Sequence, residues 1–196
     1  MPKPTIERMT RIFHLLEELE RSGDETVSSG RLGELLGFSS HSVRKDLNLI
    51  GFSGTNGARY PVRRLREFMA ETLGLARSRK FCVVGLGRLG SAILHYPFLK
   101  ESGFAIVAGF DSSVNRLETI RTDVKLYPAY QITEIVRSEG IELAALAVPG
   151  SAAQSAAERL AEGGIRGIVN FTPAPLKLPG SVQILNIDLV NELRVL

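Results

Sequence analysis

Three glycines near the middle of the chain have the spacing of a phosphate-binding turn. They occupy the glycine positions of G-x-G-x-x-G within residues 81–90. In such a turn the first glycine permits a tight bend, the second lets the backbone approach a pyrophosphate, and the third lets a helix pack closely on the preceding strand. The N–H groups and the dipole of that helix favour negative charge. The cofactor-binding residues predicted here are Gly85, Leu86, Gly87, Arg88, Leu89 and Gly90.

A carboxylate follows this turn at the distance expected in dinucleotide sites. Asp111 lies 21 residues after the last glycine, at the end of an apolar segment, 104–110. A carboxylate about 20 residues after the glycines accepts hydrogen bonds from the adenosine ribose. Asp111 therefore favours NAD over NADP, because a 2′-phosphate would meet a like charge. Ser112, Ser113 and Arg116 lie nearby and leave NADP open.

Strand-like and helix-like segments alternate from residue 80 to the end of the chain. The strands predicted from short apolar runs are 81–84, 104–110, 124–127, 143–148, 168–171 and 182–187. The predicted helices are one after the glycines with the apolar stripe Leu89, Ala92, Ile93 and Tyr96, one over 132–138, one capped by Ser151, and a short last one capped by Asp188. This alternation predicts an α/β Rossmann domain with a doubly wound parallel sheet.

Ligands in such sheets lie at the carboxyl ends of the strands, so more residues join the predicted site. The further cofactor-binding residues are Tyr96, Val148, Pro149, Asn170 and Asp188.

Residues 1–79 have a different pattern, typical of a DNA-binding domain. Thr5 is the expected cap of a first helix, and a tight turn at Gly37 separates two further helices. The helix over 41–50 has an apolar face formed by Val43, Leu47 and Ile50, whereas its other face is basic and polar. This is the helix-turn-helix pattern. Residues 41–66 hold six basic residues and one acid, a local charge of +5.

A glycine-rich loop at 51–60 follows this helix and contains the hairpin-turn pair Asn56-Gly57. Its position predicts the wing of a winged helix, which would lay Arg59 against a phosphate or in the minor groove. The predicted DNA-binding residues are His41, Ser42, Arg44, Lys45, Asn48 and Arg59. The boundary between a winged-helix domain, 1–79, and the Rossmann domain, 80–196, is expected in the basic linker.

Composition excludes several classes of protein. The chain has 196 residues, a net charge of +3 and one cysteine, Cys82, so a disulfide framework is excluded. The three histidines lack clustered ligand partners, and neither a metal site nor catalytic residues are predicted. No apolar run is long enough for a transmembrane helix, and the chain start lacks a signal peptide, so a cytoplasmic protein is expected.

Taken together, the motifs resemble those of the Rex-type redox-sensing repressors of bacteria. The resemblance covers nearly the whole chain, through LLEELE, SSGRLGELLG, SVRKDL, the G-x-x-G-T-x-G wing, VVGLGRLGSA, HYP, AVP and NFTP. It implies a homodimer that binds a palindromic DNA operator when unliganded or bound to NAD⁺, and that NADH releases. It also implies that Tyr96 and Asp188 sense the nicotinamide ring.

The chain departs from this family at three places. His14 stands where members often carry an arginine in the sensing network. The chain stops at Leu196, eight residues after Asp188, whereas the family chain typically continues into an exchanged helix. The wing ends in Gly57-Ala58-Arg59-Tyr60 instead of the usual G-x-G-Y. Domain coupling and operator affinity are therefore expected to differ.

Other functions remain open from the sequence. An NAD-dependent dehydrogenase is disfavoured, because little chain follows the Rossmann domain to form a substrate domain and no acid–base pair is evident. A regulator of the same fold responding to NADPH or coenzyme A is a second alternative. A DNA-binding protein that has lost its ligand is a third.

Overall fold

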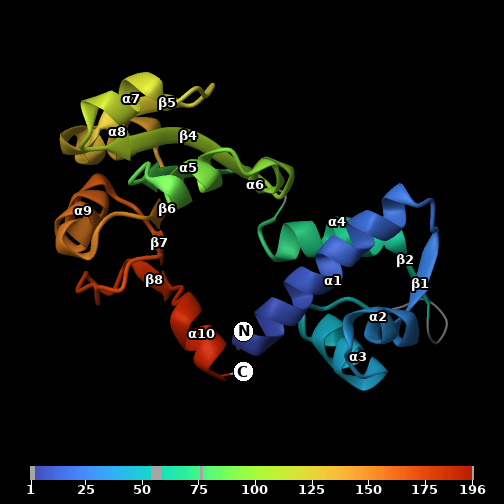
Figure 1. Ribbon diagram of the computed structural model, residues 1–196. Helices are drawn as coiled ribbons and strands as arrows, with labels where there is room; N and C mark the ends of the chain where they lie inside the picture. Colours follow the sequence, from blue (N-terminus) through green and yellow to red (C-terminus); the bar gives the residue numbers. More distant parts are fainter. Residues whose placement is uncertain (1–2, 54–58, 76, 196) are drawn as a thin grey trace. The chain divides into compact units, whose positions relative to one another are not determined.

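The computed structural model describes residues 3–53, 59–75 and 77–195, and the chain divides into two compact units, residues 1–77 and 78–196 (Figure 1). The first unit is mostly helical. Its elements are α1 (Lys3–Arg21), β1 (Thr26–Ser28), α2 (Ser29–Leu36), α3 (Ser40–Leu49), β2 (Arg59–Pro61) and α4 (Val62–Thr72). α1 packs against α4, and α2 packs against α3. The largest fully buried side chains of this unit are Met9, Ile12, Leu16, Leu32, Leu47, Leu65 and Met69.

The tight turn predicted at Gly37 joins α2 to α3, and serines cap both helices. The Ser28 hydroxyl accepts from the N–H of Arg31, and Gly37 ends α2 in the left-handed conformation. The Ser39 hydroxyl then accepts from the N–H of Ser42 at the start of α3. These hydrogen bonds join residues that are close in sequence, and they determine where the two helices begin and where α2 ends.

Two expectations for this unit are corrected. Thr5 does not cap α1, which begins at Lys3, because Pro4 in the first turn needs no N–H partner. β2 pairs with β1, antiparallel, with Val27 opposite Tyr60, and this strand between α1 and α2 was not predicted. The predicted hairpin pair Asn56-Gly57 lies outside the described residues.

The second unit is a six-stranded sheet covered by helices. Its strands are β3 (Arg79–Val84), β4 (Phe104–Asp111), β5 (Lys125–Pro128), β6 (Leu143–Leu146), β7 (Gly167–Asn170) and β8 (Gln183–Asn186). Its helices are α5 (Arg88–Leu94), α6 (Pro97–Glu101), α7 (Val114–Thr119), the 3₁₀ turn η1 (Ala129–Gln131), α8 (Ile132–Glu139), α9 (Gly150–Gly163) and α10 (Leu189–Val195). The strand order is β5-β4-β3-β6-β7-β8 and every neighbouring pair is parallel, as predicted.

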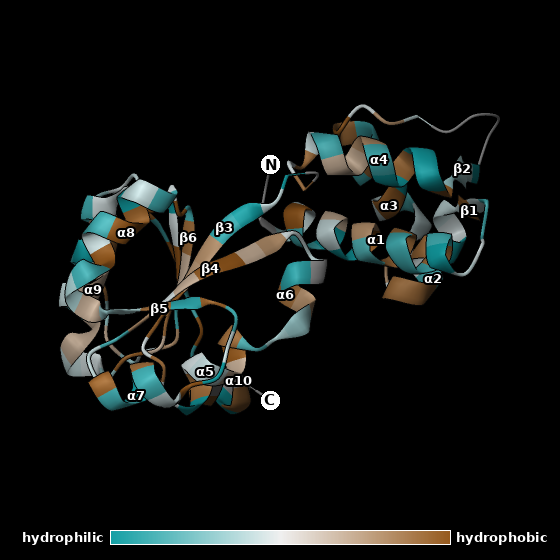
Figure 2. Ribbon diagram, turned by 90° about the horizontal axis from the view of Figure 1, so that it is seen from above, coloured by the Kyte–Doolittle hydropathy of each residue, from teal (hydrophilic) through white to brown (hydrophobic). Residues whose placement is uncertain are grey.

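Helices lie on both faces of this sheet. Figure 2 shows α8 and α9 on one face, and α5 and α7 on the other. Successive side chains of β3 alternate between the two cores: Cys82 and Val84 pack towards α8 and α9, whereas Phe81 and Val83 pack on the other side. The strand order reverses between β3 and β6, which opens a crevice at their carboxyl ends.

The helix after the glycines differs from the prediction. α5 ends at Leu94, and its buried residues are Gly90 and Leu94 rather than the predicted stripe of Leu89, Ala92, Ile93 and Tyr96. Tyr96 instead precedes Pro97 with an extended backbone and is the N-cap of α6. The cause is local, since a residue before proline is driven out of the helical region.

Smaller differences concern α7 and α9. Ser151 does not cap α9, which begins at Gly150 with Pro149 as N-cap. Residues 114–119 form the unpredicted helix α7, whose N-cap Ser113 accepts from the N–H of Arg116. α7 therefore begins three residues after Asp111, at Val114.

Candidate functional site

The fold requires glycine at two of the three positions of the turn, and the third leaves open space. Gly85 has φ +90°, and a Cβ there would lie 2.6 Å from the carbonyl oxygen of Ala147. A Cβ on Gly90 would lie 1.8 Å from the carbonyl oxygen of Gly85, so only glycine lets α5 pack this closely. A Cβ on Gly87 meets nothing within 4 Å. The space beside Gly87 is therefore open to a ligand approaching the backbone.

Asp111 joins the end of β4 to the glycine turn. Its side chain is only 3% exposed, and hydrogen-bond donors from the protein surround its carboxylate. Oδ2 accepts from the N–H of Leu86 at 2.7 Å, and Oδ1 accepts from the N–H of Ser113 at 2.8 Å. Nη1 of Arg116 lies 3.3 Å from Oδ2 and 3.4 Å from Oδ1. The buried charge is thus compensated by two backbone dipoles and one guanidinium.

A cavity of about 490 Å³ lies at the carboxyl ends of β3, β4 and β6. It contains five residues predicted for the cofactor site, namely Gly85, Gly87, Asp111, Val148 and Pro149. It is also lined by Ser112 and Arg116, which the sequence placed near Asp111, and by Ser155 and Arg159. Ser155 and Arg159 belong to α9, far away in sequence, and no motif identified them.

The remaining residues of the predicted turn lie outside this cavity. The Leu86 side chain is 2% exposed and packs in the core, while its N–H is bonded to Asp111. Arg88 and Leu89 are exposed in the first turn of α5. Leu86 therefore positions Asp111, and its own N–H is not open to a phosphate in this structure.

The side chain of Asn170 is buried and makes its hydrogen bonds within the protein. It is 1% exposed, and its Nδ2 donates to the carbonyl of Ala174 and to Oδ1 of Asn186. Its Oδ1 accepts from the N–H and from the hydroxyl of Thr172. These four bonds use the full capacity of the amide, and they hold the loop that follows β7.

Tyr96 and Asp188 also lie outside the 490 Å³ cavity. Tyr96 is 54% exposed, packs beside Phe98, and lines a different cavity that is lined by Lys100 and Arg121 as well. Asp188 is exposed, and its Oδ1 accepts from the N–H groups of Val190 and Asn191. Asp188 is therefore the N-cap of α10, as its sequence position predicted.

His95 connects α5 to the loop that follows α7. Its Nδ1 lies 2.7 Å from the carbonyl oxygen of Ser91, and its Nε2 lies 2.9 Å from that of Arg121. Carbonyl oxygens only accept, so both contacts are hydrogen bonds at the same time only when the ring carries both protons. The carbonyl of Arg121, followed by that of Ser91, raises the pKa of His95.

This arrangement gives a pH-dependent prediction for His95→Gln. The raised folded-state pKa means that the stabilisation is fully present below the ordinary value of 6.5 and is lost as the pH rises through the folded-state pKa. We expect the unfolding temperature of the wild type to exceed that of His95→Gln by a few degrees at low pH, and by less at high pH. Thermal unfolding between about pH 5.5 and 8.5 measures this. A gap that does not change with pH would contradict it.

In the first unit, α3 presents the predicted outward face. His41, Arg44, Lys45 and Asn48 are exposed, whereas Val43 and Leu47 are buried. Arg44 is also tied to α2, because its Nη1 donates to the buried hydroxyl of Ser29 at 3.1 Å. On β2, Nε of Arg59 donates to the hydroxyl of Thr26 at 3.0 Å.

Asp46 does not share this face, although it lies on the same helix. It is 3% exposed, and it accepts from Nε and Nη2 of Arg8 in α1 at 2.7 Å and 2.9 Å. The one acid in the basic segment 41–66 is therefore neutralised behind α3. Asp46 therefore does not reduce the positive charge of the outward face of α3, which carries Arg44 and Lys45.

Arg8→Ala tests whether this ion pair positions α3. Removing Arg8 leaves the buried carboxylate of Asp46 without its cationic partner, and that loss is costly. We expect the midpoint of thermal unfolding to fall by roughly 5 °C or more in a unit of this size. Arg63→Ala is the matched control, since it breaks only the exposed pair with Glu67 and should change the midpoint by less than about 2 °C. Equal effects of the two variants would show that the buried pair has no special role.

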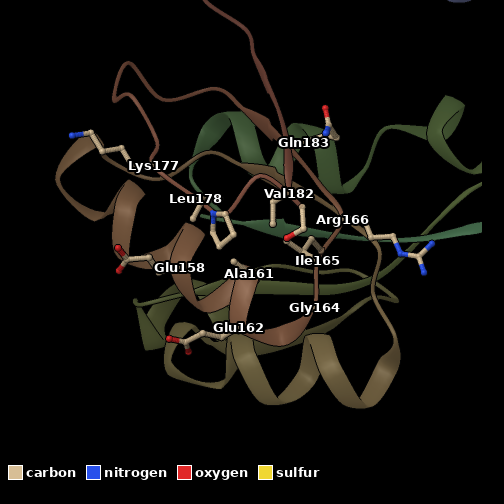
Figure 3. Close-up of a pocket in the computed structure, with 12 residues that line it drawn as sticks. Glu158, Ala161, Glu162, Gly164, Ile165, Arg166, Lys177, Leu178, Val182 and Gln183 are labelled. Atoms are coloured by element: carbon tan, nitrogen blue, oxygen red, sulfur yellow. The ribbon is translucent and has the colours of Figure 1, made fainter. Parts of the chain in front are cut away.

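A further cavity of about 840 Å³ lies elsewhere in the second unit. It lies where β7 and β8 begin, beside the end of α9, and none of the predicted site residues lines it. Figure 3 shows apolar side chains such as Ile165 and Val182 at its centre, while Lys177 and Arg166 point to opposite sides. We place the ligand site in the smaller cavity, because only that one combines the glycines with Asp111.

Some other classes of site are not supported by the described residues. Burial raises the pKa of the Cys82 thiol, which is fully enclosed and thus unreactive. In residues 3–53, 59–75 and 77–195 no group of three His, Cys, Asp or Glu side chains could hold a metal ion. No helix in these ranges is long and apolar enough to cross a membrane.

Comparisons with known proteins give consistent matches for both units. Residues 1–48 match the family described as Putative DNA-binding protein N-terminus, and residues 76–174 match the family described as CoA binding domain. The Redox-sensing transcriptional repressor Rex of Listeria welshimeri is 36% identical over 196 residues, which is all of this chain and 91% of that protein.

Two solved structures of one protein are similar over the whole chain. The crystal structure of RSP in complex with beta-NADH has a TM-score of 0.86 and 30% identity, and covers all of this chain and 91% of that one. The crystal structure of RSP in complex with beta-NAD⁺ and operator DNA has a TM-score of 0.91 and 32% identity, with coverage of 100% and 90%.

Proposed function

This chain belongs to the Rex family of redox-sensing transcriptional repressors, as its motifs predicted, and from this membership we propose that it is a DNA-binding repressor whose ligand is NAD(H). Its operator complex forms in the unliganded or NAD⁺-bound state and NADH dissociates it. The observation that carries the ligand assignment is the cavity that joins Gly87 to Asp111 at the switch point of the sheet.

The residues around this cavity fit a dinucleotide. The pyrophosphate lies over the open position of Gly87, near the N–H groups of Arg88 and Leu89 in the first turn of α5. The adenosine ribose lies at Asp111, and Val148 and Pro149 line the same cavity. When bound, the nicotinamide ring supplies the redox state, because NAD⁺ and NADH differ there by one positive charge.

Tyr96 and Asp188 respond to that charge in this proposal, and Asn170 holds the adjoining loop. Asp188 is exposed and retains acceptor capacity beyond its two capping bonds. One charge-assisted contact made in a single redox state contributes about 1.5–3 kcal/mol. A change from 1:99 to 99:1 needs about 5.5 kcal/mol, so at least two contacts must differ between the states.

DNA is bound by the domain formed by residues 1–79. α3 enters the major groove with His41, Ser42, Arg44, Lys45 and Asn48, and Arg59 contacts phosphate or the minor groove. A helix-turn-helix protein that reads a palindrome binds as a symmetric pair, so the active form is a homodimer. The site of action is the cytoplasm, where bacterial operators are.

The relatives are named as transcriptional repressors and not as enzymes, which argues against an NAD-dependent dehydrogenase. Coenzyme A stays a second candidate ligand, because residues 76–174 match the family described as CoA binding domain.

The decisive experiment is a gel shift on palindromic operator DNA, titrated separately with NAD⁺, NADH and coenzyme A. We expect NADH alone to release the DNA. Release by coenzyme A alone would replace the proposed ligand. DNA binding that is indifferent to all three would support a repressor that has lost its ligand.

A further inference from the structure

Arg116 occupies the position where an adenosine ribose must contact Asp111. It lies in α7, lines the 490 Å³ cavity, and has a half-exposed side chain. Its Nη1 is within 3.4 Å of both carboxylate oxygens of Asp111. The guanidinium therefore lies beside the carboxylate in the wall of the same cavity.

The carboxylate of Asp111 has no acceptor capacity left. An ionised carboxylate offers about four lone-pair sites. Two are used by the N–H groups of Leu86 and Ser113, and the others face Nη1 of Arg116. The two backbone donors are fixed by the fold, but Arg116 is a long side chain on the surface. A ribose hydroxyl can thus donate to Asp111 only after Arg116 has moved.

The charge in this part of the cavity favours an anion. Arg116 and Arg159 line it together with the hydroxyl residues Ser112 and Ser155, against the single carboxylate of Asp111. Nη1 of Arg159 donates to the carbonyl of Ala129, which anchors this second guanidinium at the cavity wall. Arginine matches the geometry of a phosphate with two parallel hydrogen bonds.

Resting on the function proposed above, we propose that Arg116 determines specificity at the adenosine end and that the site binds NADPH alongside NADH. The 2′-phosphate of NADPH accepts from Arg116, which turns away from Asp111 to meet it. The 2′-hydroxyl of NADH instead displaces Arg116 and donates to Asp111. Arg116 therefore favours the binding of NADPH, and it competes with the 2′-hydroxyl of NADH for the carboxylate of Asp111.

This competition predicts opposite effects of Arg116→Ala on the two ligands. The affinity for NADPH should fall by about ten- to one hundred-fold, the loss expected for a hydrogen bond to a charged group. The affinity for NADH should stay the same or increase, because the competitor for Asp111 is gone. Arg116→Lys keeps the charge but loses the forked geometry, so its NADPH affinity should lie between those of the wild type and Arg116→Ala.

The measurement is the binding of NADH and NADPH to the full chain, followed by nicotinamide fluorescence. We expect the wild-type Kd for NADPH to lie within about tenfold of that for NADH. Adenosine 2′,5′-bisphosphate should compete with NADPH in the wild type and much less in Arg116→Ala. Arg166→Ala is the control for loss of one positive charge, since Arg166 lines the distant 840 Å³ cavity.

The outcomes separate this inference from the proposed function. An Arg116→Ala variant that loses NADH and NADPH affinity equally, or a wild type that binds NADPH a thousandfold more weakly than NADH, overturns the role of Arg116. Neither result affects NADH release of DNA. A wild type that binds neither dinucleotide would instead overturn the proposed function.

Discussion

Gly87→Val is expected to give a folded repressor that binds operator DNA and is no longer released by NADH. A Cβ at this position meets no atom within 4 Å, and φ is −68°, which any residue adopts. Valine is therefore tolerated by the unliganded fold. Its side chain fills the space assigned to the pyrophosphate, so the Kd for NADH should rise at least about 100-fold, or about 2.7 kcal/mol.

Gly90→Ala is the matched control for this experiment. A Cβ at Gly90 would collide with the carbonyl oxygen of Gly85, so alanine must shift backbone. We expect Gly90→Ala to lower the unfolding temperature and Gly87→Val to leave it nearly unchanged. Normal release of DNA by NADH from a folded Gly87→Val protein would contradict the assignment of this turn to the phosphates.

Arg44→Ala and Lys45→Ala should have the largest effects on operator binding. Each residue is exposed on α3, and each lost phosphate contact should lower the slope of log affinity against log salt by about 1. We expect the affinity to fall by about ten- to one hundred-fold for a base or phosphate contact. Arg44→Ala also removes the bond to Ser29, so it should disturb α2 as well.

Fluorescence anisotropy with labelled operator DNA over a salt series measures both quantities. Lys177→Ala removes a positive charge from the second unit and should change neither the affinity nor the slope. Comparing the two α3 variants separates contact from positioning, since Lys45→Ala spares the bond to Ser29. If both variants keep the wild-type slope, α3 is not the helix that contacts DNA.

Local features of the chain could be predicted because they depend on near neighbours. Three glycines within six residues, a carboxylate at the end of the next strand, and the glycine that ends α2 each act on the backbone close to them. The parallel sheet also followed from the alternation of strands and helices, whereas the order of its strands was seen only in the structure. The interruption after Leu94 was predictable from Pro97, although the apolar pattern of α5 suggested a longer helix.

Long-range packing decided the rest. Arg8 and Asp46 are 38 residues apart in sequence, so only the ion pair that joins α1 to α3 in the folded chain shows that this acid is neutralised behind the outward face of α3. The pairing of β1 with β2 likewise joins segments on either side of the helix-turn-helix. Arg159 reaches the cavity of Asp111 because α9 crosses the sheet beside β6. The sequence by itself determined the family, the two kinds of domain and the position of the phosphate turn, whereas the tertiary structure decided which charges surround the ligand, because charge compensation depends on distances that folding sets.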